Sequence, residues 1–159
     1  TGLMSVFWPG RWQRLAVGGR TVILDAAHNL DAAAWIARNL SRYVAETGRK
    51  PSVVIGCLGE DRAAALLAVA AQYASEIFLV VPHQPRATGF DLLEGVVPDS
   101  FTGQCYRAKV GDLFPAPGVC TIGGPGDSIV VTGSIYLLGE ILEKIEYVEP
   151  LNQGMLQDF

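Results

Sequence analysis

Two apolar patterns alternate along the chain. Short runs of β-branched and other apolar residues predict buried strands, and apolar residues repeated every three or four positions predict helices. Strands are expected at 52–58, 76–81, 104–108 and 129–132, and helices at 29–48, 59–73, 91–96 and 135–146. Because strands alternate with helices, the pattern predicts an α/β fold with a mostly parallel sheet covered on both faces.

A hairpin is predicted near the start of the chain, and its second strand leads into a distinctive stretch. The segments 15–17 and 20–24 flank Gly18-Gly19, a dipeptide that suits a two-residue turn. The second strand runs directly into Asp25, and Asn29 is a suitable N-cap for the next helix. In open α/β sheets such a crossing loop lies at the carboxyl ends of the strands, where ligands bind. The sequence therefore predicts a ligand site at this loop.

The apolar faces of the first and last helices define the expected core. These faces should bury Ala33, Ile36, Ala37, Leu40 and Val44 in the first helix, and Ile135, Leu138, Ile141, Leu142 and Ile145 in the last. Between the two helices, the segment 110–127 is rich in Gly and Pro and shows no periodicity, which predicts a loop. The tail from Glu149 has few apolar residues and is expected to be loose.

Composition and charge exclude several classes of function. The 159 residues suffice for one core, and 50% hydrophobic with 18% charged residues is typical of a soluble globular protein. A net charge of −4 and the lack of a basic run argue against nucleic-acid binding. The longest apolar run, 63–71, is too short to span a bilayer, and no signal peptide is visible. We therefore expect no membrane association.

The cysteines and histidines show no pattern of a disulfide framework or a zinc site. Cys57, Cys105 and Cys120 are odd in number and widely spaced, which suits a reducing cytoplasm and predicts buried free thiols. His28 and His83 form no pair at i,i+4 spacing, so we expect no metal site built from this chain alone.

Three side chains at predicted turns each allow a functional and a structural interpretation. Asp25-x-x-His28 fits an acid–histidine pair for general-base catalysis, or a turn in which the carboxylate accepts backbone N–H bonds. Ser134 fits a plain helix N-cap, or a hydroxyl that holds a carboxylate together with free N–H groups. Arg11 follows a Pro-Gly turn, which either anchors the chain or directs the guanidinium toward an anion. No G-x-x-x-x-G-K-[ST] phosphate loop is present.

Three motifs together suggest a family. They are Trp8-Pro9-Gly10-Arg11-Trp12-Gln13, Leu24-Asp25-Ala26-Ala27-His28-Asn29 and Val131-Thr132-Gly133-Ser134-Ile135-Tyr136-Leu137-Leu138-Gly139-Glu140. The set resembles the C-terminal domain of the folylpolyglutamate synthase/dihydrofolate synthase family, which is shared in outline with the Mur ligases. The resemblance implies a three-layer Rossmann-like α/β domain over 1–148, with an antiparallel N-terminal hairpin, helices on both faces of a mostly parallel sheet, and a loose tail at 149–159.

The resemblance also implies an activity. Family members use ATP and magnesium (Mg2+) to join L-glutamate to a folate or dihydropteroate carboxylate, which is phosphorylated before the glutamate amine attacks the acyl phosphate. Arg11 would bind ATP phosphate and Asp25 the ribose region. His28 would act beside the acyl phosphate and the incoming glutamate, and Ser134 would hold a glutamate carboxylate. The phosphate loop and metal ligands belong to an N-terminal ATPase domain that this sequence lacks, so we expect this chain to have no activity on its own. We also expect the protein to be a monomer and to lie in the cytoplasm.

Three departures from the family pattern bear on the substrate. Leu30 stands where a proline is usual, Gly56–Arg62 lacks a usual lysine, and a Gly/Pro-rich loop at 115–127 replaces a helix. The choice of pterin substrate and the number of glutamates added therefore stay open. A Mur-type or other amino-acid ligase domain is one alternative, and a free-standing binding domain without catalysis is another.

Overall fold

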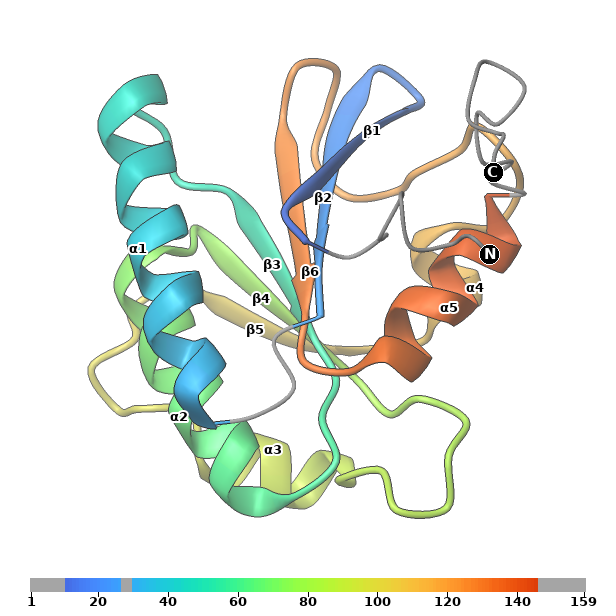
Figure 1. Cartoon of the computed structure of the whole chain (residues 1–159). Coiled ribbons are helices and arrows are strands. Elements are labelled where there is room, and N and C mark those ends of the chain that lie inside the picture. The colour runs from blue at the N-terminus through green and yellow to red at the C-terminus, as the bar shows by residue number, and fades with distance from the viewer. Residues whose placement is uncertain (1–10, 27–29, 146–159) are drawn as a thin grey trace, which may run out of the picture.

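The computed structural model describes residues 11–26 and 30–145, and their strands form one six-stranded sheet (Figure 1). The strands are β1 (Gln13–Val17), β2 (Arg20–Asp25), β3 (Ser52–Ile55), β4 (Glu76–Val80), β5 (Gln104–Ala108) and β6 (Ser128–Thr132). Their order in the sheet is β1-β2-β6-β3-β4-β5. Only the β1–β2 pair is antiparallel, so the predicted mostly parallel sheet with an N-terminal hairpin is confirmed.

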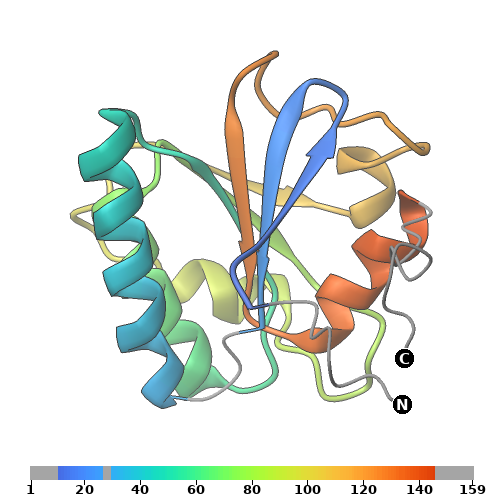
Figure 2. The same ribbon diagram turned by 45° about the horizontal axis from the view of Figure 1, so that its top comes forward.

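Helices cover both faces of the sheet, and the three layers are visible in Figures 1 and 2. The helices are α1 (Leu30–Thr47), α2 (Glu60–Tyr73), α3 (Phe90–Gly95), α4 (Val110–Leu113) and α5 (Ile135–Lys144). Residues of α1, α2 and α3 pack into one apolar cluster, whereas residues of α4 and α5 pack into another on the opposite face. The predicted three-layer α/β architecture is confirmed.

The hairpin turn has the geometry that its two glycines favour. Gly18 and Gly19 have φ angles of 58° and 80°, as a two-residue type I′ turn requires. The turn pairs Val17 with Arg20, and the ladder continues to the pair Gln13–Leu24. Both strands are longer than predicted, and Asp25 is the last residue of β2.

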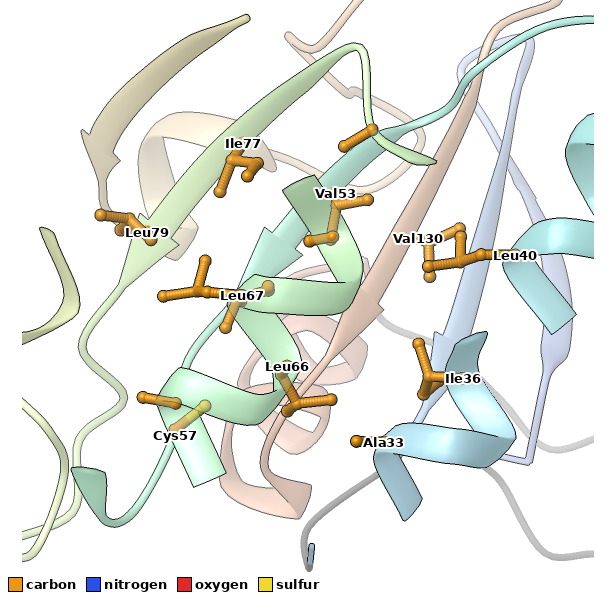
Figure 3. Packing of buried hydrophobic residues seen from close by; sticks show 14 of the residues in the cluster. Ala33, Ile36, Leu40, Val53, Cys57, Leu66, Leu67, Ile77, Leu79 and Val130 are labelled. Carbon is orange, nitrogen blue, oxygen red and sulfur yellow. The ribbon is translucent and has the colours of Figure 1, made fainter. Parts of the chain in front are cut away.

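The core between the sheet and the first two helices is continuous (Figure 3). Ile36 and Leu40 of α1 and Leu67 of α2 lie against strand residues such as Val53 and Val130. All four residues of β3 are buried, because helices cover both sides of this central strand. A strand of this kind shows a continuous apolar run in the sequence, which is the pattern that predicted it.

Several predicted details are wrong. Ile135 is 53% exposed, because it is the first residue of α5 and points away from the sheet, while Leu137 is buried instead. The segment 110–127 contains the short helix α4, in a region without helical periodicity. Ala37 and Val44 are half-buried, and Cys105 is exposed because β5 is an edge strand.

Other predictions agree with the structure or concern residues that the structure does not describe. Helix α1 stops at Thr47, followed by Gly48 with a φ of 71°. All three cysteines are free, and Cys57 and Cys120 are buried. The predicted cap Asn29 and the tail at 149–159 lie outside the described residues. No helix in the described part of the chain is both long and apolar enough to span a membrane.

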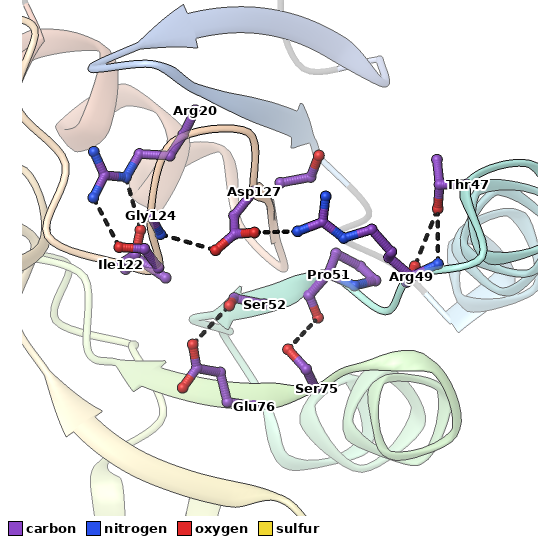
Figure 4. A network of polar contacts seen from close by, with 12 residues as sticks. Arg20, Thr47, Arg49, Pro51, Ser52, Ser75, Glu76, Ile122, Gly124 and Asp127 are labelled. Carbon is purple, nitrogen blue, oxygen red and sulfur yellow. Dashed lines mark hydrogen bonds and ion pairs between the residues drawn. The ribbon is translucent and has the colours of Figure 1, made fainter.

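A polar network fastens the amino ends of the strands (Figure 4). Arg20 donates to the carbonyl oxygens of Ile122 and Gly123 at 3.0 and 2.8 Å, which holds the Gly-rich segment before β6. Asp127 accepts a 2.8 Å bond from the N–H of Gly124 and forms an ion pair with Arg49. Contacts within the fold thus hold this end of the sheet together, and the candidate groups lie at the other end.

Candidate functional site

Two loops leave the sheet at the same edge. Asp25 and Thr132 are the last residues of β2 and β6, and they are direct partners in the parallel ladder. The chain after β2 enters α1 on one face, whereas the chain after β6 enters α5 on the other. Ligands bind at such a divergence in open α/β sheets. Asp25 and Ser134 therefore lie at the same edge of the sheet, at the ends of two neighbouring strands.

The carboxyl group of Asp25 is buried and held by two donors. The side chain is 2% exposed, and Trp35 Nε1 donates to Oδ2 over 2.9 Å. The backbone N–H of Trp12 donates a second bond. Burial raises the pKa of Asp25, while the Trp35 bond, the Trp12 bond and the charge of Arg11 oppose this rise. The buried carboxyl is thus fixed by a helix and by the turn before β1.

That turn positions Arg11 and Trp12. Trp12 has a φ of 53° in the left-handed region, which costs roughly 1 kcal/mol or more for a side chain of this size. Its ring packs against the core under α1 and anchors the turn. The exposed Arg11 lies with its Cζ atom 5.8 Å from the ring centroid of Trp35, within cation–π distance. The anchoring interpretation therefore holds for Trp12, and Arg11 is presented to solvent beside Asp25.

Ser134 serves the fold as the N-cap of α5. Its Oγ accepts a 3.0 Å bond from the N–H of Tyr136, and the residue is 1% exposed. The preceding Gly133 has a φ of 119°, and a Cβ there would lie 2.3 Å from the carbonyl oxygen of Gly56. The structure thus shows the N-cap interpretation. A carboxylate-binding role for Ser134 stays a prediction.

Thr132 carries a buried hydroxyl without a partner. The residue is 1% exposed, and its Oγ1 has no hydrogen-bond partner among the residues that the structure describes. Val130 packs toward α1 and Val131 toward α5, so strand alternation puts Thr132 on the same face as Asp25. An unpaired hydroxyl in the interior costs about 1–3 kcal/mol.

A family model described as Mur ligase, glutamate ligase domain matches residues 10–135. The chain belongs to this family. The match includes Arg11, Asp25 and Ser134. Among curated protein sequences, none matches the chain.

Solved structures share the fold of this Mur ligase domain. Folylpolyglutamate synthase from Thermotoga maritima aligns with a TM-score of 0.70 and 23% identity over 88% of this chain and 31% of its own. The bifunctional folylpolyglutamate synthase/dihydrofolate synthase of Yersinia pestis, complexed with AMPPNP and Mn ion, aligns with a TM-score of 0.68 and 21% identity over 92% and 33%. The Mycobacterium tuberculosis folylpolyglutamate synthase complexed with ADP and AMPPCP aligns with a TM-score of 0.66 and 22% identity over 89% of this chain and 33% of its own. These values confirm the resemblance in fold, and the chain spans about a third of the length of these enzymes.

Two predictions for the Mur ligase domain concern groups beyond this cluster. His28 lies outside the described residues, so its catalytic and substrate-binding roles stay predictions. Within 11–26 and 30–145, no three histidine, cysteine or acidic side chains come together in a way that could hold a metal ion.

A separate pocket of about 520 Å³ lies near the ends of β4 and β5, beside α4 and α5. Its walls include the side chains of Lys109, Lys144 and Glu143, and Glu140 there accepts a 2.5 Å bond from the N–H of His83. Of the predicted site residues that the structure describes, Arg11, Asp25 and Ser134 do not line this pocket. It contacts the face of the sheet opposite Asp25.

Sequence reasoning missed Trp35 and Thr132. Trp35 is 37% exposed on a helix surface otherwise rich in Ala and Arg, and an aromatic residue on such a face is a usable signal. Thr132 belongs to the Thr-Gly-Ser motif, but its position beside Asp25 depends on the strand order, which the chain order does not reveal.

Proposed function

We propose that this chain is the C-terminal domain of a longer ATP-dependent ligase that joins L-glutamate to a folate or dihydropteroate carboxylate. The cluster of Arg11, Asp25 and Trp35 at the edge where β2 and β6 diverge carries the proposal. The family match to a glutamate ligase domain supports it, as do the folylpolyglutamate synthase structures that contain ADP or AMPPNP.

The residue types suit the parts of a nucleotide. The exposed guanidinium of Arg11 would offset the charge of the ATP phosphates in the transition state. The Asp25 carboxylate would accept ribose hydroxyl groups at oxygen lone pairs that Trp35 and Trp12 leave open. Because Asp25 is 2% exposed, the atoms that cover it would move aside when a nucleotide binds.

The reaction would proceed in two substitutions. An oxygen of the folate carboxylate attacks the γ-phosphorus of ATP, and ADP leaves. The glutamate amine then attacks the acyl carbon, loses a proton, and phosphate leaves. His28 would lie beside this acyl group, and Ser134 would hold a glutamate carboxylate. An upstream ATPase domain would supply the magnesium ligands. The free cysteines suit the reducing cytoplasm, and we expect the enzyme to be a monomer.

The test uses the natural polypeptide that contains this chain. We expect ADP release that requires both glutamate and folate or dihydropteroate, and no product from the 159 residues alone. R11A and D25A should raise the ATP concentration needed for half-maximal rate, whereas R14A removes an exposed charge of β1 and should not. Product formation by the 159 residues alone contradicts the assignment as part of a longer enzyme. Activity on a Mur-type substrate in place of folate contradicts the assigned substrate.

A further inference from the structure

We propose that Trp35 is a positioning residue that holds Asp25 and Arg11 for the ribose and phosphates of a nucleoside triphosphate. The inference rests on the proposed function and deepens it, because it assigns a role to a third side chain of the same site. Trp35 contacts both groups at once, and each contact uses a different part of the indole.

The N–H of the indole fixes the carboxyl group of Asp25. Trp35 Nε1 carries one hydrogen and can only donate, and this hydrogen is donated to Oδ2 over 2.9 Å. A carboxylate offers about four lone-pair positions, of which Trp35 and the Trp12 N–H use two. With these two bonds in place, the carboxyl group at the end of β2 has a fixed orientation. A hydroxyl donor on a ligand would therefore meet an acceptor that is already oriented.

The ring of the indole holds the guanidinium of Arg11. The 5.8 Å separation between Cζ and the ring centroid is within the range of cation–π attraction. At an exposed position this attraction is weaker than a charge-assisted bond between arginine and phosphate. Arg11 can therefore leave the ring for an incoming phosphate, and it starts from a position beside Asp25.

The fold does not depend on Trp35 for its core. Ile36 and Leu40 are the fully buried anchors of α1, whereas Trp35 is 37% exposed. Trp35 thus connects three elements at the surface: the helix that carries it, the end of β2 and the turn before β1. A substitution there should change the arrangement of the site without unfolding the domain.

Two variants separate the two contacts. W35F removes the N–H donor and keeps an aromatic ring, while W35L removes both. In the natural polypeptide that contains this chain, calorimetry would give dissociation constants for ATP and for tripolyphosphate, which has no ribose. W35F should weaken ATP binding about fivefold, the effect of one net hydrogen bond, and leave tripolyphosphate within about twofold. W35L should weaken both ligands. Y106L, at another exposed aromatic residue, should change neither.

A double-mutant cycle with D25A tests whether Trp35 acts through Asp25. If it does, W35F combined with D25A should bind ATP no more weakly than D25A alone. Additive losses, or normal ATP binding by both Trp35 variants while R11A and D25A bind weakly, would overturn this inference and leave the proposed function intact. Absence of ATP binding by the unmodified protein would overturn both.

Discussion

Trp35 Nε1 donates a 2.9 Å hydrogen bond to Oδ2 of Asp25. The pKa of this carboxyl group is nonetheless raised, because the group is buried. Desolvation is the largest influence on this pKa, and the bonds from Trp35 and Trp12 offset it only in part. A carboxyl with a raised pKa stabilises the folded state below its unfolded pKa of 3.8, and that contribution is lost as the pH rises through the folded pKa. Above that range of pH, the burial of Asp25 therefore weakens the fold.

D25N should increase the free energy of unfolding at pH 7, because the amide stays neutral and its oxygen still accepts from Trp35. The increase should shrink as the pH falls and approach zero below about pH 3.8, where wild-type Asp25 is protonated as well. Urea unfolding followed by circular dichroism between pH 3 and 8 measures the difference. An increase that does not depend on pH would contradict the assignment to Asp25 ionisation.

D127N provides a control for which the free energy of unfolding should change in the opposite direction. The N–H of Gly124, with help from Arg49, lowers the pKa of Asp127. Its ionised form therefore stabilises the fold above the unfolded pKa of 3.8, and the contribution disappears as the pH falls through the folded pKa. D127N should lower stability at pH 7 by a small amount, since solvent screens this exposed ion pair. The loss should vanish in acid.

T132V should stabilise the domain. Valine has nearly the shape of threonine and removes the hydroxyl that lies buried without a partner, so the free energy of unfolding should rise by about 1 kcal/mol. T132S keeps the hydroxyl and deletes the methyl group, and it should lower the stability by about 0.5–1.5 kcal/mol. Denaturant midpoints at constant m-value give both differences. A loss of stability in T132V would show that the hydroxyl has a partner in solution.

The two glycines Gly133 and Gly139 should respond to alanine in opposite directions. G133A places a Cβ 2.3 Å from the carbonyl oxygen of Gly56 at a φ of 119°, so we expect a loss of about 2 kcal/mol or more. Gly139 lies within α5 with no atom within 4 Å of an added Cβ, and G139A should gain about 0.5–1 kcal/mol from helix propensity. Thermal unfolding of both variants checks this contrast.

Thiol accessibility should separate the three cysteines. Burial raises the pKa of Cys57 to about 12, and it raises the pKa of Cys120 as well. Cys105 is exposed on β5, although desolvation and Glu94 also raise its pKa. At pH 8 an aromatic disulfide reagent should therefore titrate one thiol in the folded chain, slowly, and all three after denaturation. Loss of the native reaction in C105A identifies the reactive thiol.

Local chemistry made much of the fold predictable. The Gly18-Gly19 turn and the apolar run of β3 each have one dominant physical cause, either a positive φ or burial on both faces. The same logic predicted Ser134 at a helix start. It failed for Cys105 and Ile135, whose exposure depends on the edge position of β5 and on the direction in which α5 begins.

The candidate site was predictable only in part. Arg11 and Asp25 stand out through their motifs, yet their common neighbour Trp35 is distant from Arg11 in the chain. That neighbourhood arises because α1 places Trp35 beside the end of β2 and the turn before β1, and helical periodicity carries no information about this placement. Thr132 depends in the same way on β6 inserting between β2 and β3.

Because β1 runs against β2, two arginines lie at opposite ends of the sheet: Arg11 precedes β1 at the ligand edge, and Arg20 begins β2 at the other end. An extra residue in the Gly18-Gly19 turn that shifted the β1–β2 register by one position would reverse the sides of β1. Trp12 would then no longer face Asp25. The geometry of the Gly18-Gly19 turn at one end of the sheet thus affects the alignment of Trp12 and Asp25 at the other end.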